Sequence, residues 1–161
     1  MKRITLLITL LLMPILSCTA FASDNWQWVA SNDISTIFFN PTSIKYDLDS
    51  NGNIDKNIID IEIKMQFSKD ILNEFIIGSK ANNDTTNWDD FSYTLMNAKV
   101  NKTDRLFSVY MFTYYDTSGQ ILKNFDQNTK IKIIKNTIEA DLYDAIVIYT
   151  NQHDKELERM K

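Results

Sequence analysis

A strict two-residue alternation between Ile58 and Phe67 constrains this chain more than any other feature. The apolar members are Ile59, Ile61, Ile63, Met65 and Phe67, and the residues between them are polar. Because successive side chains of a strand point to opposite faces, this pattern predicts a strand with one apolar and one solvated face. A shift of one residue would turn all five apolar side chains into water, so we expect a firm register.

The stretch 105–122 predicts a β-hairpin at the centre of an antiparallel sheet. Residues 105–115 are rich in aromatic and β-branched types and contain no Gly or Pro, which is typical of a strand. Asp116-Thr-Ser-Gly119 follows as a turn, because Asp bonds nearby backbone amides and Gly accepts a positive φ. The residues from Gln120 to Asn124 are then expected to return as the partner strand.

Both faces of strand 105–115 are substantially apolar. We assign Leu106, Tyr110, Phe112 and Tyr114 to one face, and Phe107, Val109, Met111 and Tyr115 to the other. One face is expected to meet a C-terminal helix. The other must meet a second layer, a loop or a partner, since a large exposed apolar patch marks a binding surface.

The remaining elements complete an α+β fold, an antiparallel sheet of about six strands packed against a C-terminal α-helix. Shorter strands are expected at 26–31, 35–39, 43–46, 91–100 and 131–134, and a short helix at 69–80 ending near Gly78. Asn136 and Glu139 resemble a capping box, and the apolar stripe after them predicts the C-terminal helix. The charged tail 152–161 is expected to fray.

The N-terminus predicts export. Lys2 and Arg3 precede an apolar run, and Ala20-Phe-Ala22 forms a cleavage site, which together are typical of a secretory signal peptide. We therefore expect a signal peptide at 1–22, cleavage between Ala22 and Ser23, and a single domain at 23–161. The apolar run is shorter than the ~20 residues of a transmembrane helix, so no transmembrane segment is expected in the mature chain.

A second way of processing the N-terminus stays open. Ile15-Leu-Ser-Cys18 resembles a lipobox, in which Cys18 would be lipidated and become the mature N-terminus. Cleavage at Ala22 predicts a free protein in the periplasm or at the cell surface, whereas lipidation predicts outer-membrane anchoring.

The composition excludes several classes of chemistry. Cys18 is the only cysteine, so a chain cut at Ala22 has no disulfide, zinc–thiolate site or cysteine nucleophile. Acidic residues outnumber basic ones, 21 to 17, and no basic patch stands out, so nucleic acid is not an expected partner.

One loop has the spacing of a calcium site. Its candidate oxygen ligands are Asp47, Asp49, Asn51 and Asp55. With Gly52 at the bend, they match the first nine positions of an EF-hand loop. The twelfth position, normally an acid, is Ile58, and strands are predicted on both sides. The alternative is a hairpin turn, because Asp, Asn and Gly favour turns for their own reasons.

No arrangement of residues predicts catalysis. His153, the only histidine, lies in the charged tail, which is a poor place to align a catalytic triad. The acidic pairs Asp89–Asp90 and Asp60/Glu62 are expected to be solvated. We therefore expect a protein that is not an enzyme, without catalytic residues or a cofactor.

Five short motifs follow one another along the chain. They are Trp26-x-Trp28-Val29, Phe39-Asn-Pro-Thr-Ser-Ile44, the strand ending at Phe67, Tyr114-Tyr-Asp-x-x-Gly119 and 134–139. With the exported start, this series resembles the bacterial surface-adhesin protein E-like family and covers nearly all of the mature chain. Three features differ: the family's Trp is absent near 130–132, Lys135 replaces a Pro, and the disulfide has no counterpart.

The resemblance implies an antiparallel sheet on a C-terminal helix, and surface display with binding to host extracellular-matrix or serum proteins. It matches no ligand-binding residue to this chain and assigns no oligomeric state. The alternatives are a periplasmic small-ligand-binding protein or enzyme, and a structural envelope protein, a lipoprotein through Cys18. An adhesin should show exposed aromatic or charged patches without a deep pocket, whereas a ligand-binding protein or an enzyme needs a concave site.

Overall fold

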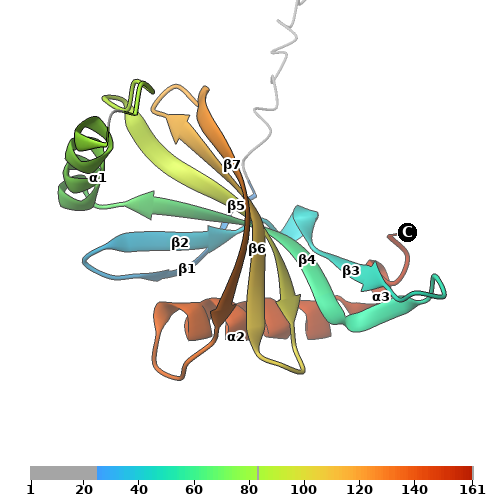
Figure 1. The fold of residues 1–161 in the computed structure, drawn as a ribbon. Helices are drawn as coiled ribbons and strands as arrows, with labels where there is room; N and C mark the ends of the chain where they lie inside the picture. Colours follow the sequence, from blue (N-terminus) through green and yellow to red (C-terminus); the bar gives the residue numbers. More distant parts are fainter. Residues whose placement is uncertain (1–24, 83, 161) are drawn as a thin grey trace, which may run out of the picture.

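The structure is a computed structural model that describes residues 25–82 and 84–160, and in this part of the chain seven strands form one antiparallel sheet (Figure 1). The strands are β1 (Gln27–Ser31), β2 (Ser35–Phe39), β3 (Lys45–Leu48), β4 (Ile54–Phe67), β5 (Phe91–Asn101), β6 (Leu106–Asp116) and β7 (Ile121–Lys132). The helices are η1 (Pro41–Ser43), α1 (Lys69–Ala81), α2 (Ile138–Gln152) and α3 (Asp154–Leu157). The predicted signal-peptide cleavage between Ala22 and Ser23 and the alternative lipidation of Cys18 concern residues outside this part.

The sheet has the order β1-β2-β4-β5-β6-β7, and β3 pairs with β4 beside β2. The long strand β4 pairs with β2 near its C-terminal end and with β3 near its N-terminal end. The α+β class is confirmed, with seven strands where about six were expected. The segments near 120–124 and 131–134 belong to one continuous strand, β7, because β6 supplies hydrogen-bond partners along its whole length.

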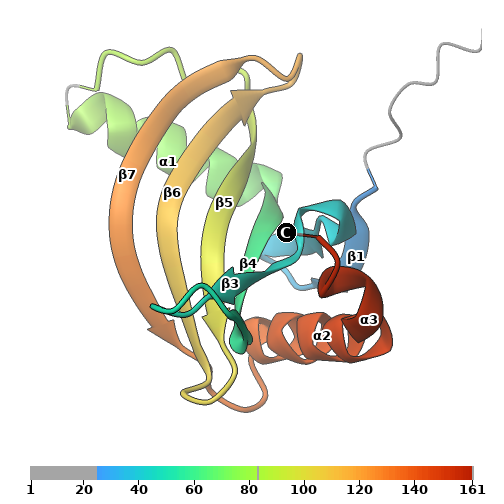
Figure 2. The same ribbon diagram turned by 90° about the vertical axis from the view of Figure 1, so that its right-hand side faces the viewer.

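The register predicted for β4 is confirmed. Ile59, Ile61 and Ile63 are between 0% and 3% exposed, and they define the inner face of the sheet. Asp60 and Glu62 lie on the opposite side, the outer face. In Figure 2, β5, β6 and β7 curve strongly along their length, with α1 near one end of these strands and α2 near the other.

The helix α2 covers one end of the inner face and forms most of the main core with it. Its buried side chains are Ala140, Leu142, Tyr143, Ile146 and Thr150. The N-cap is Thr137, whose hydroxyl accepts from the amide of Ala140 at 3.3 Å. The expected cap, Asn136, is one residue too early and has a φ of +64°.

A β-bulge changes the side-chain pattern of β6. In the pairing of β5 with β6, the consecutive residues Asn97 and Ala98 lie opposite Met111 and Val109, so Tyr110 is an additional residue of β6 there. Phe107 and Val109 are in the main core, and Phe112 packs against the same core. The predicted separation of Phe107 and Val109 from Phe112 is therefore wrong: all three lie on the inner face.

The charged C-terminal tail packs onto the core through α3, and the expectation that it frays is wrong. Leu157 of α3 is only 4% exposed and belongs to the core. The Tyr46 hydroxyl donates to Asp154 Oδ1 at 2.8 Å, and Lys56 Nζ donates to Asp154 Oδ2 at 2.7 Å. His153 stacks on Tyr149, with ring centroids 4.1 Å apart.

The expectation of a helix after β4 is confirmed by α1, although Gly78 lies inside it and does not end it. Across 25–82 and 84–160, no helix combines the length and apolar character that a membrane crossing requires.

Candidate functional site

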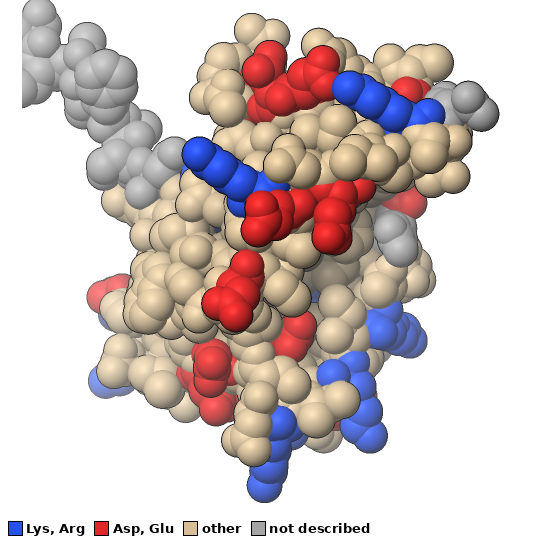
Figure 3. Space-filling view, turned by 90° about the vertical axis from the view of Figure 1, so that its left-hand side faces the viewer, with Lys and Arg blue, Asp and Glu red and all other residues tan. Residues whose placement is uncertain are grey.

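A cavity of about 270 Å³ lies between α1 and the inner face of the sheet. Its lining residues are Met65, Phe67, Ile71, Phe75, Phe91, Thr94, Met96, Phe112, Tyr114 and Ile131. They come from α1 and from β4, β5, β6 and β7. Figure 3 shows the side of the molecule that carries α1, where charged side chains lie over the helix and the surface is hollowed beneath it.

An aromatic cluster next to the cavity holds α1 in place. The Phe75 ring is 4.9 Å from the Trp88 ring, 5.1 Å from that of Phe91 and 5.9 Å from that of Tyr114, measured between centroids. Trp88 is 1% exposed, whereas no residue of α1 is fully buried. The helix therefore depends on a few aromatic contacts, and it covers the cavity with the side chains of Ile71 and Phe75.

The bulge in β6 forms one wall of this cavity. Beyond Tyr110 the alternation is reversed, so Phe112 and Tyr114 line the inner face instead of the outer face. The shorter side chain of Thr94 lies between Met65 of β4 and Tyr114 of β6 in the sheet. Helix α2 buries five side chains at the other end of the inner face, whereas α1 buries none of its residues fully, and the cavity lies beneath it.

The cavity wall is almost entirely apolar. Among the described residues, only Thr94 and Tyr114 contribute a polar side-chain group to the wall, and no Asp, Glu, Lys, Arg or His lines the space. Burial raises the pKa of the Tyr114 phenol, so this group stays neutral at physiological pH. The wall offers van der Waals contact and a neutral hydrogen bond, and it brings together no acid and base for proton transfer.

Thr94 carries an unusual hydroxyl. The residue is 2% exposed, and its Oγ1 has no hydrogen-bond partner among the described residues. A buried polar group without a partner costs free energy, and most such groups in folded proteins are bonded. This hydroxyl is the feature of the cavity that most needs an explanation.

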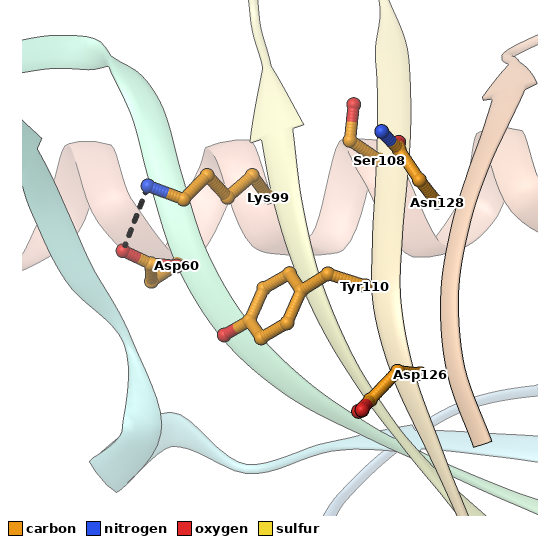
Figure 4. A pocket seen from close by; sticks show the side chains of 6 residues that line it. All are labelled: Asp60, Lys99, Ser108, Tyr110, Asp126 and Asn128. Atoms are coloured by element: carbon orange, nitrogen blue, oxygen red, sulfur yellow. Dashed lines mark ion pairs between the residues drawn. The ribbon is translucent and has the colours of Figure 1, made fainter.

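A second, open groove of about 600 Å³ lies on the outer face (Figure 4). Its lining residues are Asp60, Lys99, Ser108, Tyr110, Asp126 and Asn128. Lys99 pairs with Asp47 and lies 3.7 Å from Asp60. Burial and the negative charge of Asp60 raise the pKa of Tyr110, whose side chain is still 43% exposed. The groove is open and its lining residues all carry polar or charged groups, in contrast to those of the cavity beneath α1.

The structure places the candidate calcium residues in the hairpin between β3 and β4. Asp49 Oδ1 accepts from the amides of Asn51 and Asn53, each at 2.8 Å, and Gly52 has a φ of +78°. These contacts are those of a tight turn, which is the alternative reading of the motif.

The remaining candidate ligands are also engaged locally. Lys99 forms an ion pair with Asp47 and lowers its pKa, while Asp55 Oδ1 accepts from the amide of Asn57 at 2.9 Å. Within the described residues, no group of three or more His, Cys, Asp or Glu side chains is spaced to hold a metal ion. The calcium hypothesis stays a prediction.

The acidic pairs also have structural contacts. Asp89 pairs with Lys80 at 2.8 Å on an exposed surface, and Glu62 accepts from Asn40 Nδ2 at 3.1 Å. His153 Nδ1 lies 2.9 Å from the carbonyl of Tyr149. None of these groups lines the cavity beneath α1.

The sequence analysis did not identify this cavity. Phe75, Phe91 and Tyr114 come from separate elements, and their meeting depends on the bulge in β6, for which the sequence has no plain signal. The available sign was the apolar spacing of Ile71 and Phe75 on the helix predicted at 69–80, which indicated one buried face.

Comparison with known proteins gives no relative to which this chain can be assigned. No protein-family model, no curated protein and no solved structure matches it. The resemblance to the surface-adhesin protein E-like family therefore rests on the short motifs alone.

Proposed function

We propose that this chain is a non-enzymatic binding protein that takes a small, largely apolar ligand into the cavity beneath α1. The observation that carries this proposal is the wall itself, which is apolar and aromatic and contains Thr94 as an isolated buried hydroxyl. Ligand pockets in proteins typically combine such a wall with a few placed polar groups. The same observation favours the small-ligand alternative raised by the sequence.

The size of the cavity sets the size of the ligand. An engineered apolar cavity of about 150 Å³ binds benzene, so a space of about 270 Å³ suits a substituted benzene ring or a short aliphatic chain. For ligands of this size, the usual affinity per non-hydrogen atom predicts dissociation constants of about 10 µM to 1 mM. Charged ligands are disfavoured, because no opposite charge lines the wall and desolvation of an ion is costly.

Two substitutions in α1 test this proposal, with calorimetric titration of 4-propylphenol as the measurement. Ile71 lines the cavity, whereas Ile77 is 69% exposed on the same helix. Ile71→Trp should fill the space and weaken binding at least tenfold, and Ile77→Trp should leave it unchanged. The absence of saturable binding to the wild-type protein, or equal losses in both variants, would contradict the proposal.

Adhesion is a second candidate function, favoured by the bare outer face. No helix covers this face of β5, β6 and β7 in Figure 2, and it presents Tyr110 beside acidic and basic groups in an open groove. Together with the resemblance, this arrangement supports binding of host extracellular-matrix or serum proteins.

Surface plasmon resonance against a panel of such host proteins tests adhesion. Wild-type protein should bind at least one of them saturably, and Tyr110→Ala should weaken that binding. Phe125→Ala, which removes another exposed aromatic side chain of the sheet, is the control. A panel without saturable binding would end this candidate.

We propose that the protein acts outside the cytoplasm under either candidate function. We propose export with cleavage between Ala22 and Ser23, or anchoring to the outer membrane through Cys18. The support is the sequence of the first 22 residues.

A further inference from the structure

We infer that the ligand of the cavity beneath α1 is a neutral molecule with one hydroxyl or carbonyl group, which hydrogen-bonds to Thr94. This inference rests on the proposed binding function and specifies the chemistry of the ligand. Its basis is the buried Thr94 hydroxyl, which has no partner in the described part of the chain.

The buried Thr94 hydroxyl costs the protein free energy as long as no ligand is bound. Thr94 is 2% exposed, and its neighbours across the sheet are Met65 and Tyr114. Valine has nearly the same shape, suits a strand equally well and brings no polar group. Threonine at this position therefore gains nothing from packing and leaves a hydrogen bond unmade.

The contrast with Thr150 supports this reading. Thr150 is also fully buried, at 0% exposed. Its hydroxyl donates to the carbonyl of Val147 at 3.0 Å, so the protein itself satisfies this group. Thr94 has no equivalent contact within the described part of the chain, and it is one of the residues that line the cavity.

The Thr94 hydroxyl also indicates the class of ligand. A threonine hydroxyl both donates and accepts, and its staggered rotamers let it turn toward a bound group. An alcohol, a phenol or a carbonyl compound can complete its hydrogen bond. A carboxylate or an amine fits poorly, because no ionised side chain lines the cavity to balance its charge.

The test is a thermodynamic cycle with two ligands of nearly the same shape. 4-Propylphenol and 4-propyltoluene differ by a hydroxyl in place of a methyl group. We expect Thr94→Val to shift the ratio of their dissociation constants about tenfold against the phenol, which is the usual effect of leaving a buried hydroxyl unpaired. Thr94→Ser and Thr150→Val should keep the wild-type ratio.

The outcomes separate this inference from the proposed function. If neither compound binds to the wild-type protein, the binding function itself is wrong. If both bind and Thr94→Val leaves their ratio unchanged, the cavity binds ligands but the role of Thr94 is wrong. If the valine variant does not fold, Thr94→Ala removes the same hydroxyl and gives the same comparison.

Discussion

At the scale of single residues, Thr94 is costly to the fold, and we propose that its hydroxyl serves the cavity beneath α1. Its hydroxyl is buried in a largely apolar wall and has no hydrogen-bond partner among residues 25–82 and 84–160. Residues that serve a ligand often carry such a cost, because stability and function select for different side chains. The sequence alone could not reveal this, since a threonine in a predicted strand has many ordinary explanations.

Thr94→Val should therefore stabilise the empty protein. Removal of an unsatisfied buried hydroxyl is expected to raise the free energy of unfolding by about 1 kcal/mol. Thr150→Val removes a hydroxyl that is hydrogen-bonded, and it should lower this free energy by a similar amount. Urea unfolding followed by circular dichroism measures both, and a loss of stability in Thr94→Val would count against the account.

A second residue-scale prediction concerns pH and Asp154. The ammonium group of Lys56, followed by the hydroxyl of Tyr46, lowers the pKa of this carboxyl. Because this pKa is lower in the folded protein than in the unfolded chain, the ionised carboxylate stabilises the fold. The stabilisation is complete above the pKa of the unfolded chain, about 3.9, and it is lost as the pH falls through the pKa of the folded protein. Burial, followed by the hydrogen bond to Asp154, raises the pKa of Tyr46 to about 12.

Asp154→Asn should thus lower the urea midpoint at pH 6, and the difference from wild type should shrink as the pH falls below about 3.9. Urea titrations at several pH values between 2 and 6 measure this trend. A difference that stays constant over this range would show that Asp154 does not act through its charge.

At the scale of elements, the register of β4 could be predicted and the arrangement of β6 could not. Alternation in β4 matches a regular strand, so Ile59, Ile61 and Ile63 are buried as expected. In β6 the bulge at Tyr110, opposite β5, reverses the alternation. Both residue parities of this strand are apolar, and the two-residue pattern therefore could not indicate which residues face inward.

The C-terminal segment illustrates a different limit of local patterns. A run of charged residues predicts a solvated tail, but Leu157 supplies one apolar anchor and Asp154 an ionic one. The cavity and the packing of α3 both depend on contacts between elements that are distant in the sequence, so local patterns could indicate neither. The residues next to Phe75 and Leu157 in the sequence do not indicate which side chains these two residues contact in the fold.

Leu157→Ala should destabilise the protein by about 2–3 kcal/mol, which is typical of a buried leucine replaced by alanine. Met160→Ala, in the same segment but 58% exposed, should change the free energy of unfolding by less than about 0.5 kcal/mol. Thermal and urea unfolding provide the measurement. Equal, small effects in both variants would mean that α3 contributes little to the core.

At the scale of the whole molecule, helices α1 and α2 pack against the same curved sheet to different extents. Helix α2 buries several side chains against the inner face and completes the main core. Helix α1 buries none of its residues fully and leaves a cavity beneath it. The fold class could be predicted from the periodicity of the sequence. The difference in packing between the two ends of the inner face depends on how side chains meet in the assembled structure, which the sequence pattern does not show.

Processing of the N-terminus is a further prediction at this scale. The intact mass of the protein recovered from a bacterial envelope should equal that of an unmodified chain starting at Ser23. A chain that starts at a diacylated Cys18 would show instead that the protein is anchored to the membrane. The two products differ by five residues and the lipid, so one mass spectrum separates them.

The most direct measurement of the central claim is methyl NMR of the protein during titration with 4-propylphenol. Binding beneath α1 predicts saturable shifts of the Met65, Met96, Ile71 and Ile131 methyl signals, all with one dissociation constant. Ile34 and Ile148, which are 52% and 57% exposed, should not shift. If the cavity methyls do not respond, or if the shifts are confined to Ile34 and Ile148, the claim is contradicted.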